Sequence, residues 1–295
     1  MNDTKINNPI NEVKPFDSVQ VINKYAIYST IQDDPIFQIN KNKISEPIFC
    51  GGVIKNFNQN VYNFRINEFV GYNSQKNDLN IELSSNLIFK LKEYGNQKLI
   101  AVLPYASYAL KILREVNPTL GKNILIIDLN FFSILLFKLI KLSGANISII
   151  NLEKNDINYE KEIDDIDVYN DIDDAIMKFR KISIDDVINV SDLNQKTSKF
   201  LNNINFKNKF SINQISIYDV GVEDPNYIKG IKYPYPYVRW EYKENLKYFI
   251  YLVENKILNI DFLEIAQIKV ASINALKQYL KKIQKNSMIL FKLCK

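Results

Sequence analysis

The stretch GKNILIIDLNFFSILLFKLIKLSGANISIIN, residues 121–151, decides the fold. Residues 123–127 (NILII) and 146–151 (NISIIN) are short apolar runs, which are typical of strands buried on both faces. Between them, residues 131–142 are apolar on nearly every side, which predicts a buried helix, and Gly144 follows as a stop signal. The stretch therefore predicts a strand–helix–strand unit whose two strands are parallel.

The sequence on either side of this unit predicts two different kinds of structure. Upstream, turn residues separate short β-like runs, which predict a β-rich, barrel-like unit; the runs are residues 18–22, 25–29, 47–55, 68–72 and 79–83. A helix with Pro104 early in it is predicted for residues 99–116. Downstream, we expect strands at 187–190, 214–218 and 287–293 and helices at 244–255 and 270–284.

The composition is that of a folded, water-soluble chain. Hydrophobic residues make up 46% of the 295 residues and charged residues 24%, which are ordinary globular values. The net charge of +5 comes from lysines spread along the chain, so it indicates solvated surface and no nucleic-acid partner. The polar N-terminus lacks a signal-peptide core, and lysines interrupt the longest apolar stretch, residues 131–150. We therefore expect a cytoplasmic protein without a membrane span.

Several kinds of catalytic site are excluded by the residues that are missing. The chain has no histidine, which removes the commonest general base and metal ligand. Its two cysteines, Cys50 and Cys294, cannot complete a four-thiolate zinc site, and free thiols are favoured over a disulfide between them. The acid-rich residues 153–186 lack calcium-loop spacing and are interpreted as solvated helix faces and turns. The sequence predicts no metal site.

The order of these pieces resembles the medium-chain dehydrogenase/reductase superfamily. Residues 51–54 (GGVI) are similar to its glycine–valine strand. Residues 64–70 (FRINEFV) are similar to its "fkvGDrV" segment, with Asn67 in place of the glycine. Residues 99–116 resemble the helix before the nucleotide-binding domain, and residues 121–151 resemble the first strand–helix–strand of that domain. The resemblance implies an α/β fold: a GroES-like β-rich domain plus a Rossmann-type parallel sheet, with the site in the cleft between them.

The resemblance also implies boundaries and common properties. The expected parts are a flexible N-terminal arm (1–17), the GroES-like domain (18–98), the Rossmann-type domain (99–257) and a C-terminal segment that returns to the first domain (258–295). Members of the superfamily use NAD(P), and many pair through the edge of the Rossmann sheet, which leaves a homodimer open. Their catalytic zinc is held by cysteine, histidine and carboxylate, so this chain is expected to be zinc-independent.

Residues 224–258 resemble a more particular subgroup, which carries a "YDpxYexxGxDYPxxYVRWTxxrNmxaf" segment. That subgroup is often fused to a second oxidoreductase domain in bacterial clusters for surface polysaccharide, and this sequence is expected to correspond to the first half. Within the segment, Tyr237, Arg239 and Trp240 are candidate ligands for a substrate or a phosphate, because arginine presents a planar fork of donors. The other interpretation is an arginine–carboxylate pair that locks the loop, with Trp240 in the core.

The dinucleotide fingerprint is the decisive departure from the superfamily. Its three glycines give a tight turn, close approach of the pyrophosphate and close helix packing. Aligned on Ile127 and Gly144, these positions hold Asp128, Asn130 and Ser133. Asp128 adds a negative charge where an anion should lie, or else caps the helix.

At the end of the second strand, Asn151 takes the place of the acid that binds the ribose hydroxyls. NAD(P) is therefore implied by the resemblance and opposed by these residues.

Two main functions follow. One is a degenerate, zinc-independent dehydrogenase-like protein that serves as a non-catalytic binding or partner subunit in surface-polysaccharide or other specialised metabolism. The alternative is an active zinc-independent NAD(P)H-dependent oxidoreductase with an altered phosphate loop. A third is a nucleotide-sugar-binding protein that uses the same crevice. The partner would be a small-molecule or sugar-linked substrate, or a protein. No residue is assigned as a catalytic acid or base.

Overall fold

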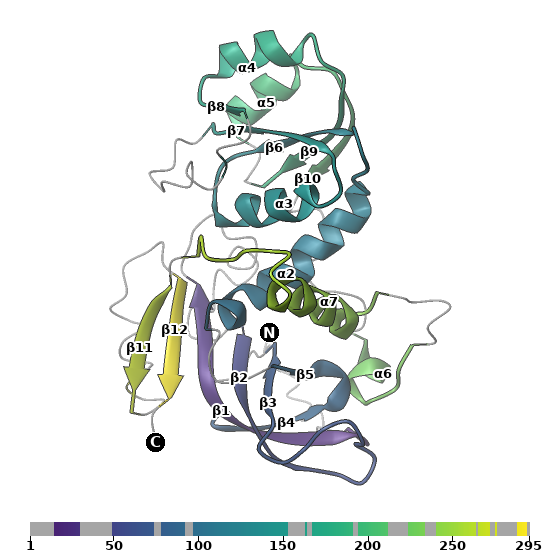
Figure 1. Ribbon diagram of the computed structural model, residues 1–295, viewed down its shortest axis with the longest axis vertical. Coiled ribbons are helices and arrows are strands. Elements are labelled where there is room, and N and C mark those ends of the chain that lie inside the picture. Colours follow the sequence, from purple (N-terminus) through teal and green to yellow (C-terminus); the bar gives the residue numbers. More distant parts are fainter. Residues whose placement is uncertain are drawn as a thin grey trace, which may run out of the picture.

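Figure 1 shows the computed structural model of the chain, in which two sheets lie at opposite ends of the molecule. The structure describes residues 15–29, 49–73, 78–91, 97–152, 163, 167–190, 194–211, 224–233, 240–263, 265–271, 275 and 288–293. In this part of the chain, one sheet has seven strands and is mostly antiparallel, and the other has five parallel strands. Helix α2 (Gln97–Val116) runs from one sheet to the other, with α7 (Tyr242–Glu254) beside it (Figure 1).

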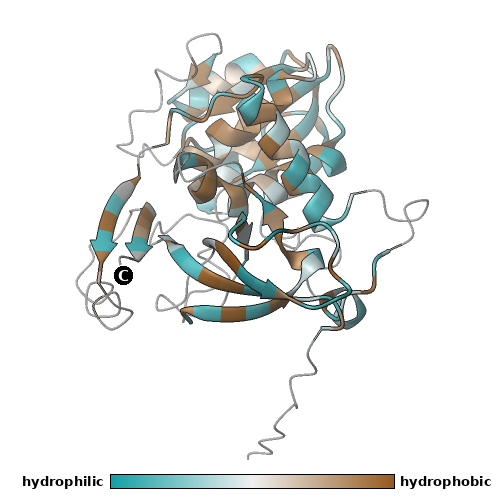
Figure 2. Cartoon of the chain, turned by 60° about the horizontal axis from the view of Figure 1, so that its bottom comes forward, coloured by the Kyte–Doolittle hydropathy of each residue, from teal (hydrophilic) through white to brown (hydrophobic). Residues whose placement is uncertain are grey.

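The first sheet is built from both ends of the chain. Its order is β11-β12-β1-β2-β3-β5, with β4 also paired to β1. The strands are β1 (Ser18–Ser29), β2 (Phe49–Phe57), β3 (Phe69–Tyr72), β4 (Asn80–Ser84), β5 (Phe89–Lys90), β11 (Ala266–Val270) and β12 (Met288–Leu293). The turn η1 (Ser85–Leu87) joins β4 to β5. Apolar residues recur along these strands (Figure 2), and one apolar set, which includes Val21, Tyr28 and Tyr72, forms a separate core.

The parallel sheet confirms the predicted strand–helix–strand unit. Strands β6 (Asn123–Ile127) and β7 (Asn146–Ile150) pair in parallel, and α3 (Phe131–Lys141) connects them. The sheet order is β10-β9-β6-β7-β8, and the other strands are β8 (Val168–Tyr169), β9 (Ile184–Asn189) and β10 (Phe206–Ser211). Helices α4 (Ile172–Phe179) and α5 (Gln195–Leu201) cover the face opposite α3 (Figure 1). Both faces of β6 are therefore buried, as its apolar run predicts.

One apolar core joins the two sheets through the helices between them. It contains Tyr25 and Phe89 from the first sheet, Leu103 from α2, Ile126 from β6 and Phe249 from α7, all buried. Leu125 and Ile127 point the other way and pack with α4 and α5 in a second core. The short helix α6 (Pro225–Ile228) lies against η1, where the Asn86 side chain donates to the Tyr227 carbonyl oxygen.

Several expected elements need correction. The two runs 18–22 and 25–29 form the single strand β1, whose register against β2 shifts near Gln20 and between Asn23 and Tyr25. Strand β9 begins earlier than the expected residues 187–190. Strands β10 and β11 and helices α4 and α5 were not predicted. Residues 214–218 and most of 270–284 lie outside the described residues, as does Cys294, whereas Cys50 is buried in β2.

Gly52 occupies a position in β2 that admits no side chain. A Cβ atom there would overlap the Ile22 carbonyl oxygen and lie 2.8 Å from Val21 Cγ1, both in β1. We expect Gly52→Ala to lower the free energy of unfolding by about 1–3 kcal/mol, because the two strands must separate to accept it. Urea denaturation measures this loss. Gly51→Ala is the matched control, because the nearest atom to its Cβ would be Phe69 Cζ at 3.3 Å, and an equal loss at both positions would contradict the prediction.

Candidate cofactor site

The turn after β6 keeps the backbone shape of the dinucleotide fingerprint without its glycine. Asp128 has a φ of +75°, in the left-handed region that glycine favours and that aspartate and asparagine tolerate. Its backbone N–H donates to the Ile150 carbonyl oxygen (2.7 Å), and its Oδ1 accepts from the Leu152 N–H (3.0 Å). The side chain is 1% exposed. Asp128 therefore ties the end of β6 to the chain leaving β7, and the expectation that it caps the helix is wrong.

Asn130 and Ser133 close the N-terminus of α3 by capping each other. Asn130 is the N-cap residue, and its Oδ1 accepts from the Ser133 N–H (2.9 Å). In return, Ser133 Oγ accepts from the Asn130 N–H (2.7 Å). Both side chains are buried. The N–H groups of a first helical turn are the donors that bind a pyrophosphate in dinucleotide sites, and here two of them are already bonded within the chain.

Aromatic rings pack around the same helix start. The Tyr105 ring of α2 meets the Phe131 ring edge to face at 4.6 Å, and the Tyr108 ring stacks on Phe132 at 5.4 Å. All four side chains are buried, and burial raises the pKa of Tyr108. The sequence analysis did not identify Tyr105, because nothing in an apolar helix distinguishes a residue that packs on a distant turn. These contacts place apolar surface beside a turn that usually faces phosphate.

Asn151 lies at the end of β7, next to the turn. Its backbone N–H donates to the Tyr169 carbonyl oxygen (2.8 Å), and the residue is 5% exposed. Within the described part of the chain, its Oδ1 has no hydrogen-bond partner. The structure thus brings Asp128, Asn130, Ser133 and Asn151 together at the carboxyl edge of two neighbouring parallel strands, where ligands bind in folds of this kind.

The other predicted ligands are only partly described. Tyr237 and Arg239 lie outside the described residues. Trp240 is half-buried before α7, where the Arg114 guanidinium lies 4.1 Å from the centre of its ring and the Tyr248 ring lies 6.1 Å away. Trp240 thus stacks with a cation from α2. Its role in binding a substrate stays a prediction.

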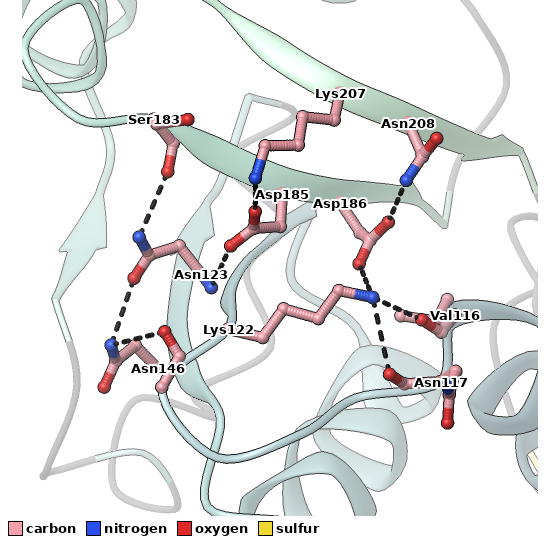
Figure 3. Close-up of polar contacts among 11 residues, drawn as sticks. Val116, Asn117, Lys122, Asn123, Asn146, Ser183, Asp185, Asp186, Lys207 and Asn208 are labelled. Carbon is pink, nitrogen blue, oxygen red and sulfur yellow. Dashed lines mark hydrogen bonds and ion pairs between the residues drawn. The ribbon is translucent and has the colours of Figure 1, made fainter.

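A polar cluster lies at the opposite, amino-terminal edge of the parallel sheet (Figure 3). Lys122 Nζ lies 2.5 Å from Asp186 Oδ2 and donates to the Val116 carbonyl oxygen at the end of α2 (2.7 Å). Asp186 Oδ1 accepts from the Asn208 side chain (3.0 Å). The Asp186 side chain is 1% exposed. Because the Asp186 charge is paired with Lys122 and Oδ1 accepts from Asn208, this cluster fastens α2 to the sheet and is interpreted as structural. The sequence analysis did not foresee it.

Metal and membrane features were searched over the described residues alone. They contain no group of three or more cysteine, aspartate or glutamate side chains placed to hold a metal ion. None of their helices is both long and apolar enough to span a membrane. The expectation of zinc independence stays a prediction.

Comparison with known proteins identifies the fold. No family model and no curated protein matches the sequence. An alcohol dehydrogenase from Thermus sp. ATN1 has a TM-score of 0.63 at 9% identity, over 94% of this chain and 92% of that one. For 2R,3R-butanediol dehydrogenase from Bacillus subtilis the TM-score is 0.61 at 15% identity, over 95% of this chain and 93% of that one. For the protein CAD from Helicobacter pylori, complexed with NADP(H), the TM-score is 0.59 at 14% identity, over 95% of this chain and 91% of that one.

The chain therefore has the fold of the medium-chain dehydrogenases/reductases, a GroES-like β-rich domain plus a Rossmann-type parallel sheet. This confirms the fold class and the resemblance predicted from the sequence.

Proposed function

We propose that this protein is a degenerate dehydrogenase-like protein that does not hold a dinucleotide in the usual way, and that it serves as a non-catalytic binding or partner subunit. The observation that carries the proposal is the closed start of α3. Asn130 and Ser133 use each other's backbone N–H groups, so these donors are not available to a pyrophosphate. The partner would be another protein or a small sugar-linked molecule.

Charge supports the same proposal. The Asp128 carboxylate lies at the turn where the pyrophosphate of a dinucleotide would approach, and it is buried. Two like charges about 4 Å apart repel by roughly 1–4 kcal/mol in water or near a protein surface. Asp128 cannot swing away without giving up its bond to the Leu152 N–H, so the repulsion would persist in a complex.

One observation favours the alternative, an active zinc-independent NAD(P)H-dependent oxidoreductase. Among the described residues, none donates to the buried Oδ1 atom of Asn151, which lies at the position where ribose hydroxyls bind in the superfamily. A buried acceptor without a partner costs about 1–3 kcal/mol, and a ribose hydroxyl would satisfy it. In this alternative, the left-handed turn at Asp128 would accept a displaced pyrophosphate.

Titration with NADPH and NADH separates the two functions. We expect calorimetry to detect no saturable binding of either cofactor with a dissociation constant below about 1 mM, because the donors are used and the charge is repulsive. ADP-ribose, which lacks the nicotinamide, is the matched control and is expected to behave in the same way. Saturable binding at sub-millimolar concentration would contradict the non-catalytic function and favour the alternative.

A further inference from the structure

Five apolar side chains stand exposed on three neighbouring segments: the residues just before β1, the loop from β2 to β3, and α6 with the residues after it. We call this set the apolar patch; it consists of Phe16, Tyr62, Ile66, Ile228 and Ile231. Tyr62 is 86% exposed, and Phe16, Ile66 and Ile231 are each more than half exposed. Soluble proteins rarely leave contiguous apolar surface uncovered, so the apolar patch indicates a place where the chain meets something else.

Phe16 joins the three segments. Its backbone N–H donates to the Lys229 carbonyl oxygen at the end of α6 (3.3 Å). Its own carbonyl oxygen accepts from the side chains of Asn58 and Asn60 in the β2–β3 loop. A Cβ atom at Gly230 would lie 2.7 Å from Phe16 Cε1, so the Phe16 ring rests against the end of α6. The three segments therefore share one surface, and α6 lies on the side of the first sheet opposite β11 (Figure 1).

Three exposed cations border the apolar patch: Arg65 in the β2–β3 loop, and Lys229 and Lys232 directly after α6. Among the described residues, no carboxylate lies within ion-pair distance of any of these three side chains. Glu68, the acid of the same loop, pairs with Lys90 at 2.7 Å. The patch therefore presents apolar side chains inside a positive border, which complements a surface that is negative outside and apolar beneath.

The shape of the apolar patch favours a lipid bilayer as its partner. The β2–β3 loop buries Val61 and Phe64, whereas Ile66 and most of the Tyr62 side chain project into solvent. Projecting side chains can enter the headgroup region of a bilayer without a matching pocket, and tyrosine favours that region. Lysine and arginine lay their stems on apolar surface while their charges reach lipid phosphates. A protein partner would need both a pocket for Tyr62 and an acidic rim.

We propose that the apolar patch docks on the surface of an anionic lipid bilayer. Tyr62 and Ile66 enter the headgroup region, and Arg65, Lys229 and Lys232 contact the lipid phosphates. The attraction combines apolar burial with charge, because each basic residue held near an anionic membrane strengthens binding about fivefold. The patch lies outside the dinucleotide turn, so the proposal does not depend on the function proposed above.

The test is co-sedimentation of the full-length protein with lipid vesicles. We expect binding to vesicles of phosphatidylcholine with about one-third phosphatidylglycerol to be at least about tenfold stronger than binding to phosphatidylcholine alone. Binding should weaken as the salt concentration is raised, because salt screens the attraction between the cations and the lipid phosphates. Protein centrifuged without vesicles is the blank for aggregation.

Two double variants separate the contributions of charge and apolar burial. Lys229→Ser with Lys232→Ser should weaken binding to the anionic vesicles about tenfold or more, because two of the three bordering charges are lost. Tyr62→Ser with Ile66→Ser should weaken it by a similar factor, because the side chains that enter the headgroup region are removed. All four side chains are exposed, so both variants should fold as the parent does.

A control variant makes the same kind of change beside the parallel sheet. Met177→Ser with Lys181→Ser replaces an exposed apolar residue of α4 and an exposed lysine that follows it, and should leave vesicle binding unchanged. Equal binding to both kinds of vesicle, or an equal loss in the control variant, would overturn the proposal. Absence of binding to anionic vesicles would also overturn it and would leave the apolar patch to an acidic protein partner.

Discussion

Lys122→Met is expected to lower the free energy of unfolding by about 3–5 kcal/mol, the cost of leaving a buried charge without its partner. Asp186 is 1% exposed, and Lys122 is the cation that the structure places against it. After the substitution, the Asn208 amide would be the remaining side-chain donor to this carboxylate. The end of α2 would also lose the bond from Lys122 to the Val116 carbonyl oxygen.

Chemical denaturation measures the loss at Lys122, and the same cluster supplies the control. Lys207→Met removes the cation that pairs with Asp185, but Lys207 is 66% exposed, so we expect a much smaller loss than for Lys122→Met. The double variant Lys122→Met with Asp186→Leu should recover part of the loss, because it removes the unpaired charge. Similar losses for Lys122→Met and Lys207→Met would show that the burial of Asp186 does not matter.

The double variant Asp128→Gly with Asn130→Gly is expected to gain saturable NADPH binding. Removing the carboxylate relieves a repulsion of roughly 1–4 kcal/mol, which corresponds to about 5-fold or more in affinity. Removing the Asn130 side chain also releases the Ser133 N–H for a phosphate oxygen. The gain should be partial, because Tyr105 still packs on Phe131. Calorimetric titration of the variant beside the parent measures it.

A control variant tests whether the gain in binding depends on where the two glycines are introduced. Asp171→Gly with Asn194→Gly replaces the same two residue types at the N-caps of α4 and α5, which cover the other face of the sheet. It should gain no binding. The variant Asp128→Gly with Asn130→Gly should stay folded. Glycine suits the left-handed backbone at position 128 and costs only a few tenths of a kcal/mol at an N-cap. If it folds and still binds nothing, the obstacle lies in the aromatic packing.

Local signals explain which parts of the fold could be predicted. The strand–helix–strand unit was predicted closely, because continuous apolar runs and Gly144 mark its ends without help from distant residues. The resemblance also aligned Asn67 and Asp128 with two glycines of the superfamily. Both residues have a positive φ, of 66° and 75°. The backbone therefore keeps a glycine-like shape at both places, although each carries a side chain.

The missed elements have weak local signals. Strand β10 (FKNKFS) has two apolar residues, Phe206 and Phe210, with three polar residues between them, and its place depends on pairing with β9. Helix α4 could have been predicted, because Asp171 is a typical N-cap residue and apolar residues follow at helical spacing. These are Ile172, Ala175, Ile176 and Phe179. Because of its neighbouring aspartates, the region was interpreted only as solvated helix faces and turns, and no helix was assigned there.

The candidate site was predicted in position but not in detail. The spacing of Asn130 and Ser133 is that of an N-cap and the third residue of a helix, so their reciprocal capping could have been inferred in place of a cap at Asp128. The contact of Tyr105 with Phe131 could not have been inferred from the sequence, because it joins residues 26 positions apart on separate elements. The pairing of Lys122 with Asp186 joins residues that are still farther apart in the sequence.

The burial of helix α2 limits which substitutions this chain can accept during evolution. Residues 99–110 are all buried, and all of them except Pro104 and Ser107 share one apolar core with strands of both sheets. A larger or smaller side chain at any of these twelve positions disturbs two halves of the molecule at once. The sequence of this helix should therefore change slowly during evolution. Residues 99–110 would identify distant homologues better than the altered dinucleotide fingerprint does.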